Sequence, residues 1–103
     1  MSSKPKSAAL RELHDRLIGD NPKKQAEYEE TLVNIQAAQL IYDMRTAANL
    51  SQRELAKKVG TTASVICRLE DADYTGHTLQ MLNRIASALG RQIEIRAIPK
   101  EAA

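Results

Sequence analysis

Apolar residues recur at helical spacing in the N-terminal half of the chain. Between residues 7 and 19 a spacing of i, i+3 and i+7 predicts a short amphipathic helix, carried by Leu10, Leu13 and Leu17. Asn21 then suits an N-cap, and Pro22 suits the first position of a new helix. A long helix is therefore predicted from Pro22 to about Ala48.

The long helix carries two apolar stripes on opposite sides when its positions are placed at about 100° per residue. One stripe consists of Tyr28, Leu32 and Ile35. The other consists of Val33, Ala37, Leu40, Ile41, Met44 and Ala48. We expect the second stripe to pack into the domain that follows. The first stripe then faces the preceding helix, a second subunit or another protein, and packing of both stripes inside one small bundle is an equal alternative.

The next helix has clear start and stop signals. Ser51 and Glu54 form a capping box, in which each side chain accepts a hydrogen bond from the backbone N–H of the other residue. The helix is predicted over residues 52–59. Gly60 ends it because a left-handed backbone is needed at that position.

Two further helices are predicted in the C-terminal half. Thr62 can cap a helix over residues 63–70, and Thr78 can cap a helix that runs to Gly90. The intervening loop is expected to leave His77 facing solvent.

The C-terminal residues 91–97 alternate polar and apolar side chains, with β-branched residues at apolar positions, which predicts a strand ended by Pro99. The backbone of a lone strand needs a partner, and the sequence contains no second strand pattern. Antiparallel pairing with a second copy would make a homodimer with Ile93 and Ile95 on its buried face. Pairing with a different protein, or a frayed end, is the alternative.

Composition supports one small, mainly helical domain. The chain has 103 residues, of which 43% are apolar and 27% charged, and it contains no Phe or Trp. A core of Leu, Ile, Val, Ala and Met favours helices. The sequence shows neither a signal-peptide pattern nor an apolar run of the roughly 18 to 20 residues that cross a bilayer. We therefore expect a cytoplasmic protein that does not contact a membrane.

Chemistry-bearing residues are sparse. Cys67 is the single cysteine, so an internal disulfide is excluded, and with only His14 and His77 beside it no metal or cofactor is implied. The sequence also has no Gly-rich phosphate loop and no nucleophile at a recognisable spacing from a histidine. These observations argue against an enzyme.

The net charge of +2 is unevenly distributed, because residues 45–70 contain five basic and two acidic side chains. The same stretch holds two short helices joined by a tight turn, the arrangement of a helix-turn-helix. On the second helix Ile66 and Leu69 face the core at about 100° per residue. The opposite, exposed face consists of Ala63, Ser64, Cys67 and Arg68.

This exposed face can enter a DNA groove. Its small residues permit close approach, and Arg68 can bind a guanine edge with two hydrogen bonds. Oxidation of Cys67 would block such docking, although a small residue tolerated at the groove is the simpler interpretation. From geometry alone, DNA binding and plain helix packing are equal alternatives.

Residues 50–70 closely resemble the lambda-repressor-like helix-turn-helix domains of the XRE family. The matching elements are Ser-Gln-x-Glu-Leu-Ala at 51–56 and Arg-Leu-Glu at 68–70, followed by Leu82 and residues 85–90. The resemblance covers residues 36–90 and implies binding of double-stranded operator DNA. It implies that Gln52 contacts a backbone phosphate and that the start and exposed face of the second helix read bases. The implied DNA-binding set is Gln52, Thr61, Thr62, Ala63, Ser64, Cys67 and Arg68.

Two positions depart from the family pattern. Ala63 stands where longer polar side chains are common, which shifts the expected recognition toward DNA shape. The loop over residues 71–77 is acidic where the family often carries Lys or Arg.

The segments that flank the domain contain Asn21-Pro22 and Ala26-Glu27-Tyr28-Glu29 on the N-terminal side and Gln92-Ile93-Glu94-Ile95 on the C-terminal side. With these motifs they look like the flanks of HigA-type antitoxins. Such proteins pair with a small, basic RelE/HigB-like toxin that cleaves messenger RNA, and they repress their own operon as dimers. The resemblance implies three regions: a toxin-binding extension over 1–35, a DNA-binding domain over 36–90, and a dimerisation strand and tail over 91–103. The implied toxin-binding residues are Leu10, Leu13, Leu17, Tyr28, Leu32 and Ile35. A free-standing XRE-type repressor without a toxin partner, and an interaction module that has lost DNA binding, are the alternatives.

Overall fold

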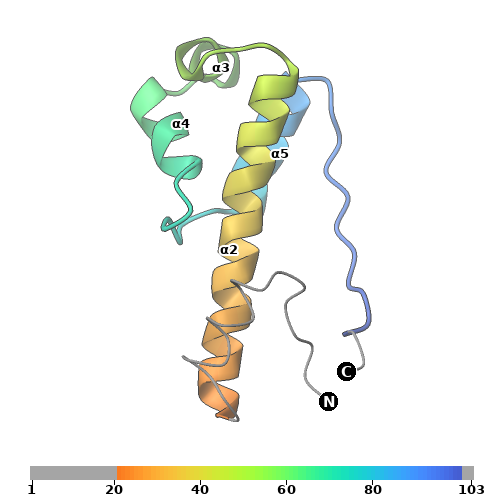
Figure 1. The fold of residues 1–103 in the computed structure, drawn as a ribbon. Helices are drawn as coiled ribbons and strands as arrows, with labels where there is room; N and C mark the ends of the chain where they lie inside the picture. Colours follow the sequence, from red (N-terminus) through yellow and green to blue (C-terminus); the bar gives the residue numbers. More distant parts are fainter. Residues whose placement is uncertain (1–20, 101–103) are drawn as a thin grey trace. The chain divides into compact units, whose positions relative to one another are not determined.

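The structure is a computed structural model that describes residues 21–100 (Figure 1). Its helices are α2 (Pro22–Ala47), α3 (Gln52–Val59), α4 (Ala63–Leu69) and α5 (Leu79–Ala88). The mainly helical class is confirmed, and the predicted bounds of these helices agree with the observed ones to within two residues. The helix predicted over 7–19 lies outside the described residues, as do Leu10, Leu13 and Leu17.

The described residues divide into two compact units, one formed by residues 21–30 and 95–100 and the other by residues 31–94. In the first unit, Asn21 caps α2, because its side-chain oxygen accepts the backbone N–H of Lys23 at 2.9 Å. Lys100 Nζ lies 2.8 Å from Glu29 Oε1. The hydrogen bond from Lys100 lowers the pKa of the Glu29 carboxyl.

The unit of residues 31–94 is built around one apolar core to which all its helices contribute. α3 packs against both α4 and α5. Each fully buried aliphatic side chain contributes about 1.5–3 kcal/mol of transfer free energy. The buried cluster consists of Ile41 and Met44 from α2, Leu55 and Ala56 from α3, Ile66 and Leu69 from α4, and Ile85 and Ala86 from α5.

The cap residues stop and start these helices as the sequence predicts. Ser51 Oγ accepts the Glu54 N–H at 3.0 Å, and Glu54 Oε1 accepts the Ser51 N–H at 2.9 Å. The pKa of the Glu54 carboxyl is lowered, chiefly by the hydrogen bond from the Ser51 backbone N–H and then by its hydrogen bond with the Ser51 side chain. Thr62 and Thr78 accept hydrogen bonds at the starts of α4 and α5. Gly60 adopts a φ of +84° at the end of α3, which is the left-handed conformation that favours glycine.

The buried face of α2 differs from the predicted stripe. Ile41 and Met44 are buried as expected, but Val33 is 62% exposed and Leu40 is 40% exposed, whereas Ala38 is buried. At 100° per residue the buried face is rotated by about 50° from the predicted one. From the predicted stripe, Ile41 and Met44 enter the buried cluster shared with α3, α4 and α5. Which side of α2 is covered depends on these other helices, and the periodicity of α2 alone does not reveal their position.

The C-terminal residues 91–100 have no regular secondary structure, and the part of the chain described here contains no strand. A strand needs a neighbouring strand for its backbone hydrogen bonds, and residues 21–94 contain no strand. The single chain therefore does not confirm the predicted strand, and pairing with a second copy stays a prediction.

Candidate nucleic-acid interface

The helix-turn-helix is formed by α3, the turn at residues 60–62, and α4. The turn is held from three sides. Gly60 donates its N–H to the Ala56 carbonyl at 2.9 Å, Thr62 caps α4, and Arg84 of α5 donates from Nη2 to the Val59 carbonyl at 3.0 Å. These contacts stabilise the turn between α3 and α4.

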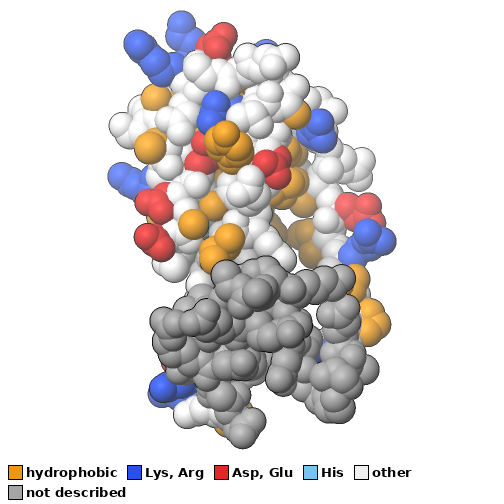
Figure 2. All heavy atoms as spheres, viewed as in Figure 1, with side chains coloured by type: hydrophobic (Ala, Val, Ile, Leu, Met, Phe, Trp, Pro, Cys, Tyr) orange, Lys and Arg blue, Asp and Glu red, His pale blue; other side chains and the backbone are white. Residues whose placement is uncertain are grey.

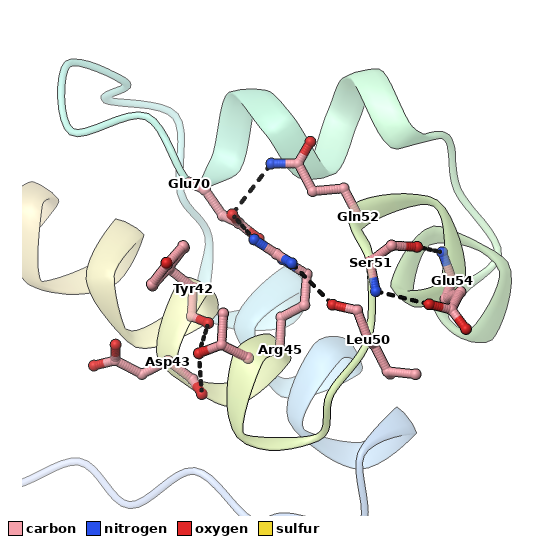
Figure 3. Close-up of polar contacts among 9 residues, drawn as sticks. Tyr42, Asp43, Arg45, Leu50, Ser51, Gln52, Glu54 and Glu70 are labelled. Carbon is pink, nitrogen blue, oxygen red and sulfur yellow. Dashed lines mark hydrogen bonds and ion pairs between the residues drawn. The ribbon is translucent and has the colours of Figure 1, made fainter.

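A polar network ties α2 to both helices of the motif (Figure 3). Arg45 of α2 donates from Nε to Glu70 Oε2 at 2.6 Å and from Nη2 to Glu70 Oε1 at 2.9 Å. Its third donor, Nη1, bonds the Leu50 carbonyl at 2.8 Å, and Gln52 of α3 donates from Nε2 to Glu70 Oε1 at 3.2 Å. The Arg45 and Glu70 side chains are only 13% and 6% exposed. The hydrogen bonds that the Arg45 guanidinium donates to Glu70 raise the pKa of Arg45.

This network was not predicted from the sequence, although a signal for it was present. At 100° per residue Glu70 falls about 40° from Ile66 on α4, on the core-facing side of that helix. A carboxylate at such a position needs a cationic partner. Arg45 lies on the buried side of α2 and is the partner.

The predicted base-reading face of α4 faces solvent. Ser64, Cys67 and Arg68 are exposed, while Ile66 and Leu69 on the opposite side are buried. Ala63 and Thr61 are half-buried. The exposed Thr62 uses its hydroxyl oxygen to accept the Val65 N–H at 3.3 Å, so it contributes primarily as a cap.

Both helices of the motif carry exposed basic side chains. Arg53, Lys57 and Lys58 on α3 are exposed, as is Arg68 on α4. Figure 2 shows Lys and Arg side chains gathered over α3 at the top of the view. The positive potential of such a cluster attracts polyanions.

A comparison with protein families identifies the motif. A family described as "Helix-turn-helix domain" matches residues 22–98. The chain belongs to this helix-turn-helix domain family. An uncharacterised HTH-type transcriptional regulator from Methanothermobacter thermautotrophicus is 43% identical over 53 residues, which cover 52% of this chain and 75% of the relative. No solved structure matches the chain.

The loop after α4 in the helix-turn-helix domain is held by His77, which is half-buried rather than facing solvent as predicted. Its Nε2 lies 2.6 Å from the Leu69 carbonyl, and its ring meets Tyr74 edge-on at 5.0 Å. A Cβ at Gly76 would lie 2.3 Å from the Tyr74 hydroxyl oxygen, so only glycine permits this packing. Contacts between loop residues have no periodic signature, which is why the sequence pattern did not reveal them.

The structure places the described residues of the predicted toxin-binding set in different environments. Tyr28 is 8% exposed, and this burial raises the pKa of its hydroxyl. Leu32 is half-buried, and Ile35 is 36% exposed.

The two residues predicted to share a dimer face also differ. Ile93 packs against the core of the helix-turn-helix domain, whereas Ile95 is 68% exposed. Ile93 also lines a shallow hollow with Leu40 and Met44 on α2.

Within residues 21–100, none of the helices has the length and apolarity needed to cross a membrane. The same residues contain no group of three or more His, Cys, Asp and Glu side chains that could hold a metal ion.

Proposed function

We propose that this chain is a transcriptional regulator that binds double-stranded operator DNA through α4. The observation that carries the proposal is the exposed face of α4, with Ser64, Cys67 and Arg68 directed to solvent on a helix anchored by Ile66 and Leu69. In a helix-turn-helix, the second helix enters the major groove while the first crosses the phosphate backbone.

The side chains divide into two roles under this proposal. Arg68 reads a guanine through two hydrogen bonds to its major-groove edge. Lys57 and Lys58 on α3, with Gln52 at its start, contact phosphates and set the position of the protein on the duplex. The small residues Ala63 and Ser64 let the backbone of α4 approach the bases closely.

DNA binding is tested by selecting duplexes from a random-sequence pool with purified protein and titrating the selected duplex by fluorescence anisotropy. Ser64→Glu places a long carboxylate on the proposed DNA face and is expected to abolish binding by steric overlap and repulsion. Ser87→Glu adds the same group at an exposed serine of α5 and serves as the matched control. Equal binding by the two variants would contradict the assignment of α4.

We further propose that this regulator is the antitoxin of a type II toxin-antitoxin pair. It would neutralise a small RelE/HigB-like ribonuclease and repress their shared operon. The support is the sequence resemblance of the flanking segments together with two features of α2: Glu27 and Glu30 are exposed, and further along the helix Ile35 is exposed. An acidic and apolar surface suits a basic ribonuclease. A repressor without a toxin partner fits the helix-turn-helix domain equally well.

Growth of cells that express the adjacent small open reading frame, alone and with this protein, separates the two alternatives. Growth arrest that co-expression relieves supports the antitoxin. Ile35→Asp should then abolish relief while DNA binding persists, because it places a charge on the proposed toxin-binding face. Val33→Asp alters an exposed β-branched residue on the other side of α2 and is the control. A harmless neighbour, or toxicity that is not relieved, favours the free-standing repressor.

The proposed regulator acts as a homodimer joined by antiparallel pairing of residues 91–98. The support is the alternating pattern of this segment and the exposure of Ile95. Two copies would present two α4 helices to successive major-groove faces, roughly 34 Å apart. Light scattering after size exclusion should give a dimer for the native protein and for Gln92→Asp, and a monomer for Ile95→Asp. A dimer that survives Ile95→Asp would contradict this interface.

A further inference from the structure

Gln52, the first residue of α3, has its side-chain amide held by the carboxylate of Glu70, the residue that caps the end of α4 (Figure 3). Its Nε2 donates to Glu70 Oε1 at 3.2 Å. Because a carboxylate only accepts hydrogen bonds, Glu70 determines which way the amide faces, with the nitrogen toward itself. An amide nitrogen carries two hydrogens, and the bond to Glu70 uses one of them, so the amide retains a second N–H for another acceptor.

We propose that Glu70 is a positioning residue for DNA binding, which orients the Gln52 amide so that its second N–H meets a backbone phosphate. Arg45 neutralises the negative charge of the Glu70 carboxylate. The inference rests on the proposed DNA-binding function, since it specifies how one phosphate contact of that interface is prepared.

The physical basis is preorganisation together with charge balance. A glutamine side chain that is free in solution loses rotamer freedom when it binds, whereas an amide already held by Glu70 loses less. An isolated carboxylate near DNA would repel the phosphates. The two hydrogen bonds from Arg45, at 2.6 and 2.9 Å, cancel that charge locally. Glu70 can therefore lie beside the DNA backbone without opposing it.

The test compares the effect of Gln52→Ala in two backgrounds. One is the native protein. The other is Arg45→Met with Glu70→Leu, which removes both buried charges together and leaves neither unpaired. Thermal unfolding first establishes that the second background is folded. Affinities are then measured for the duplex selected by the native protein and for a scrambled duplex of the same length.

In the native background we expect Gln52→Ala to weaken binding by about tenfold, the effect of one hydrogen bond to a charged group. The loss should be equal on both duplexes, since a phosphate contact carries no sequence information. In the charge-free background the same substitution should change affinity by less than about twofold. Gln39→Ala is the matched control, because Gln39 donates to Asp43 on the exposed surface of α2 at 2.8 Å. It should leave binding unchanged in both backgrounds.

A loss from Gln52→Ala that is equal in the two backgrounds overturns the positioning role while leaving DNA binding intact. Failure of the native protein to bind any duplex instead contradicts the proposed function. A second measurement needs no change to the ion pair: the side-chain amide protons of Gln52, assigned by their loss in Gln52→Ala, are followed by NMR during addition of the selected duplex. One proton should shift strongly and the other little. Equal small shifts of both protons would overturn the proposal.

Discussion

The ion pair between Arg45 and Glu70 makes a sharp prediction about stability. The two side chains are 13% and 6% exposed and share two hydrogen bonds. Arg45→Met leaves the Glu70 carboxylate buried without its counter-charge, which costs about 3–5 kcal/mol of unfolding free energy. A small domain has about 5–15 kcal/mol in total. At roughly 4–8 °C per kcal/mol, the expected fall in melting temperature is at least about 12 °C.

Combining Arg45→Met with Glu70→Leu should recover most of this loss, because the unpaired buried charge is gone and two apolar side chains of similar size replace the pair. Urea unfolding followed by far-UV circular dichroism gives the free energy of unfolding of the native protein and both variants. Two results would contradict this prediction. One is a free energy of unfolding for Arg45→Met within about 1 kcal/mol of the native value, and the other is a double variant that is no more stable than the single variant.

Three further predictions follow from the caps and charges of the helix-turn-helix. Glu54→Gln keeps the capping geometry without a titrating group. The pKa of the Glu54 carboxyl in the folded protein is below its ordinary value of 4.5. The ionised carboxylate therefore stabilises the folded protein above pH 4.5, and this stabilisation is lost as the pH falls through the folded pKa. The melting temperature of the native protein should exceed that of Glu54→Gln most near neutral pH, and a difference that grows in acid would contradict this. Gly60→Ala should lower the free energy of unfolding by about 1–2 kcal/mol, measured by urea unfolding, because residue 60 has a positive φ. The added Cβ would lie 4.0 Å from Arg84 Nη2, so the cost comes from the backbone conformation and not from a clash. An unchanged stability would contradict this prediction. Lys57→Ala should lower the slope of log affinity against log salt concentration by about one, and an unchanged slope would remove Lys57 from the phosphate contacts.

Local signals account for most of what the sequence predicts correctly. Helix boundaries at Ser51, Gly60, Thr62 and Thr78 depend on hydrogen bonds within a few residues, so cap residues identify them without knowledge of the rest of the fold. The exposed face of α4 follows in the same way from helical periodicity.

The features that the sequence did not reveal depend on contacts between distant segments. The buried face of α2 includes Arg45, whose partner Glu70 lies 25 residues away. The position of His77 depends on the Leu69 carbonyl and on the ring of Tyr74. In both cases the deciding group is remote. Helical periodicity places Glu70 on the core-facing side of its helix, but it does not identify Arg45 as the partner.

The most direct test of DNA binding through α4 is the affinity of Arg68→Ala for the duplex selected by the native protein, compared with variants of that duplex at each base pair. We expect a loss of about 1–3 kcal/mol, roughly 5- to 150-fold, on the selected duplex, with discrimination relaxed at one base pair and retained at the others. Unchanged affinity and unchanged discrimination at every base pair would contradict the assignment of α4 as the element that reads DNA.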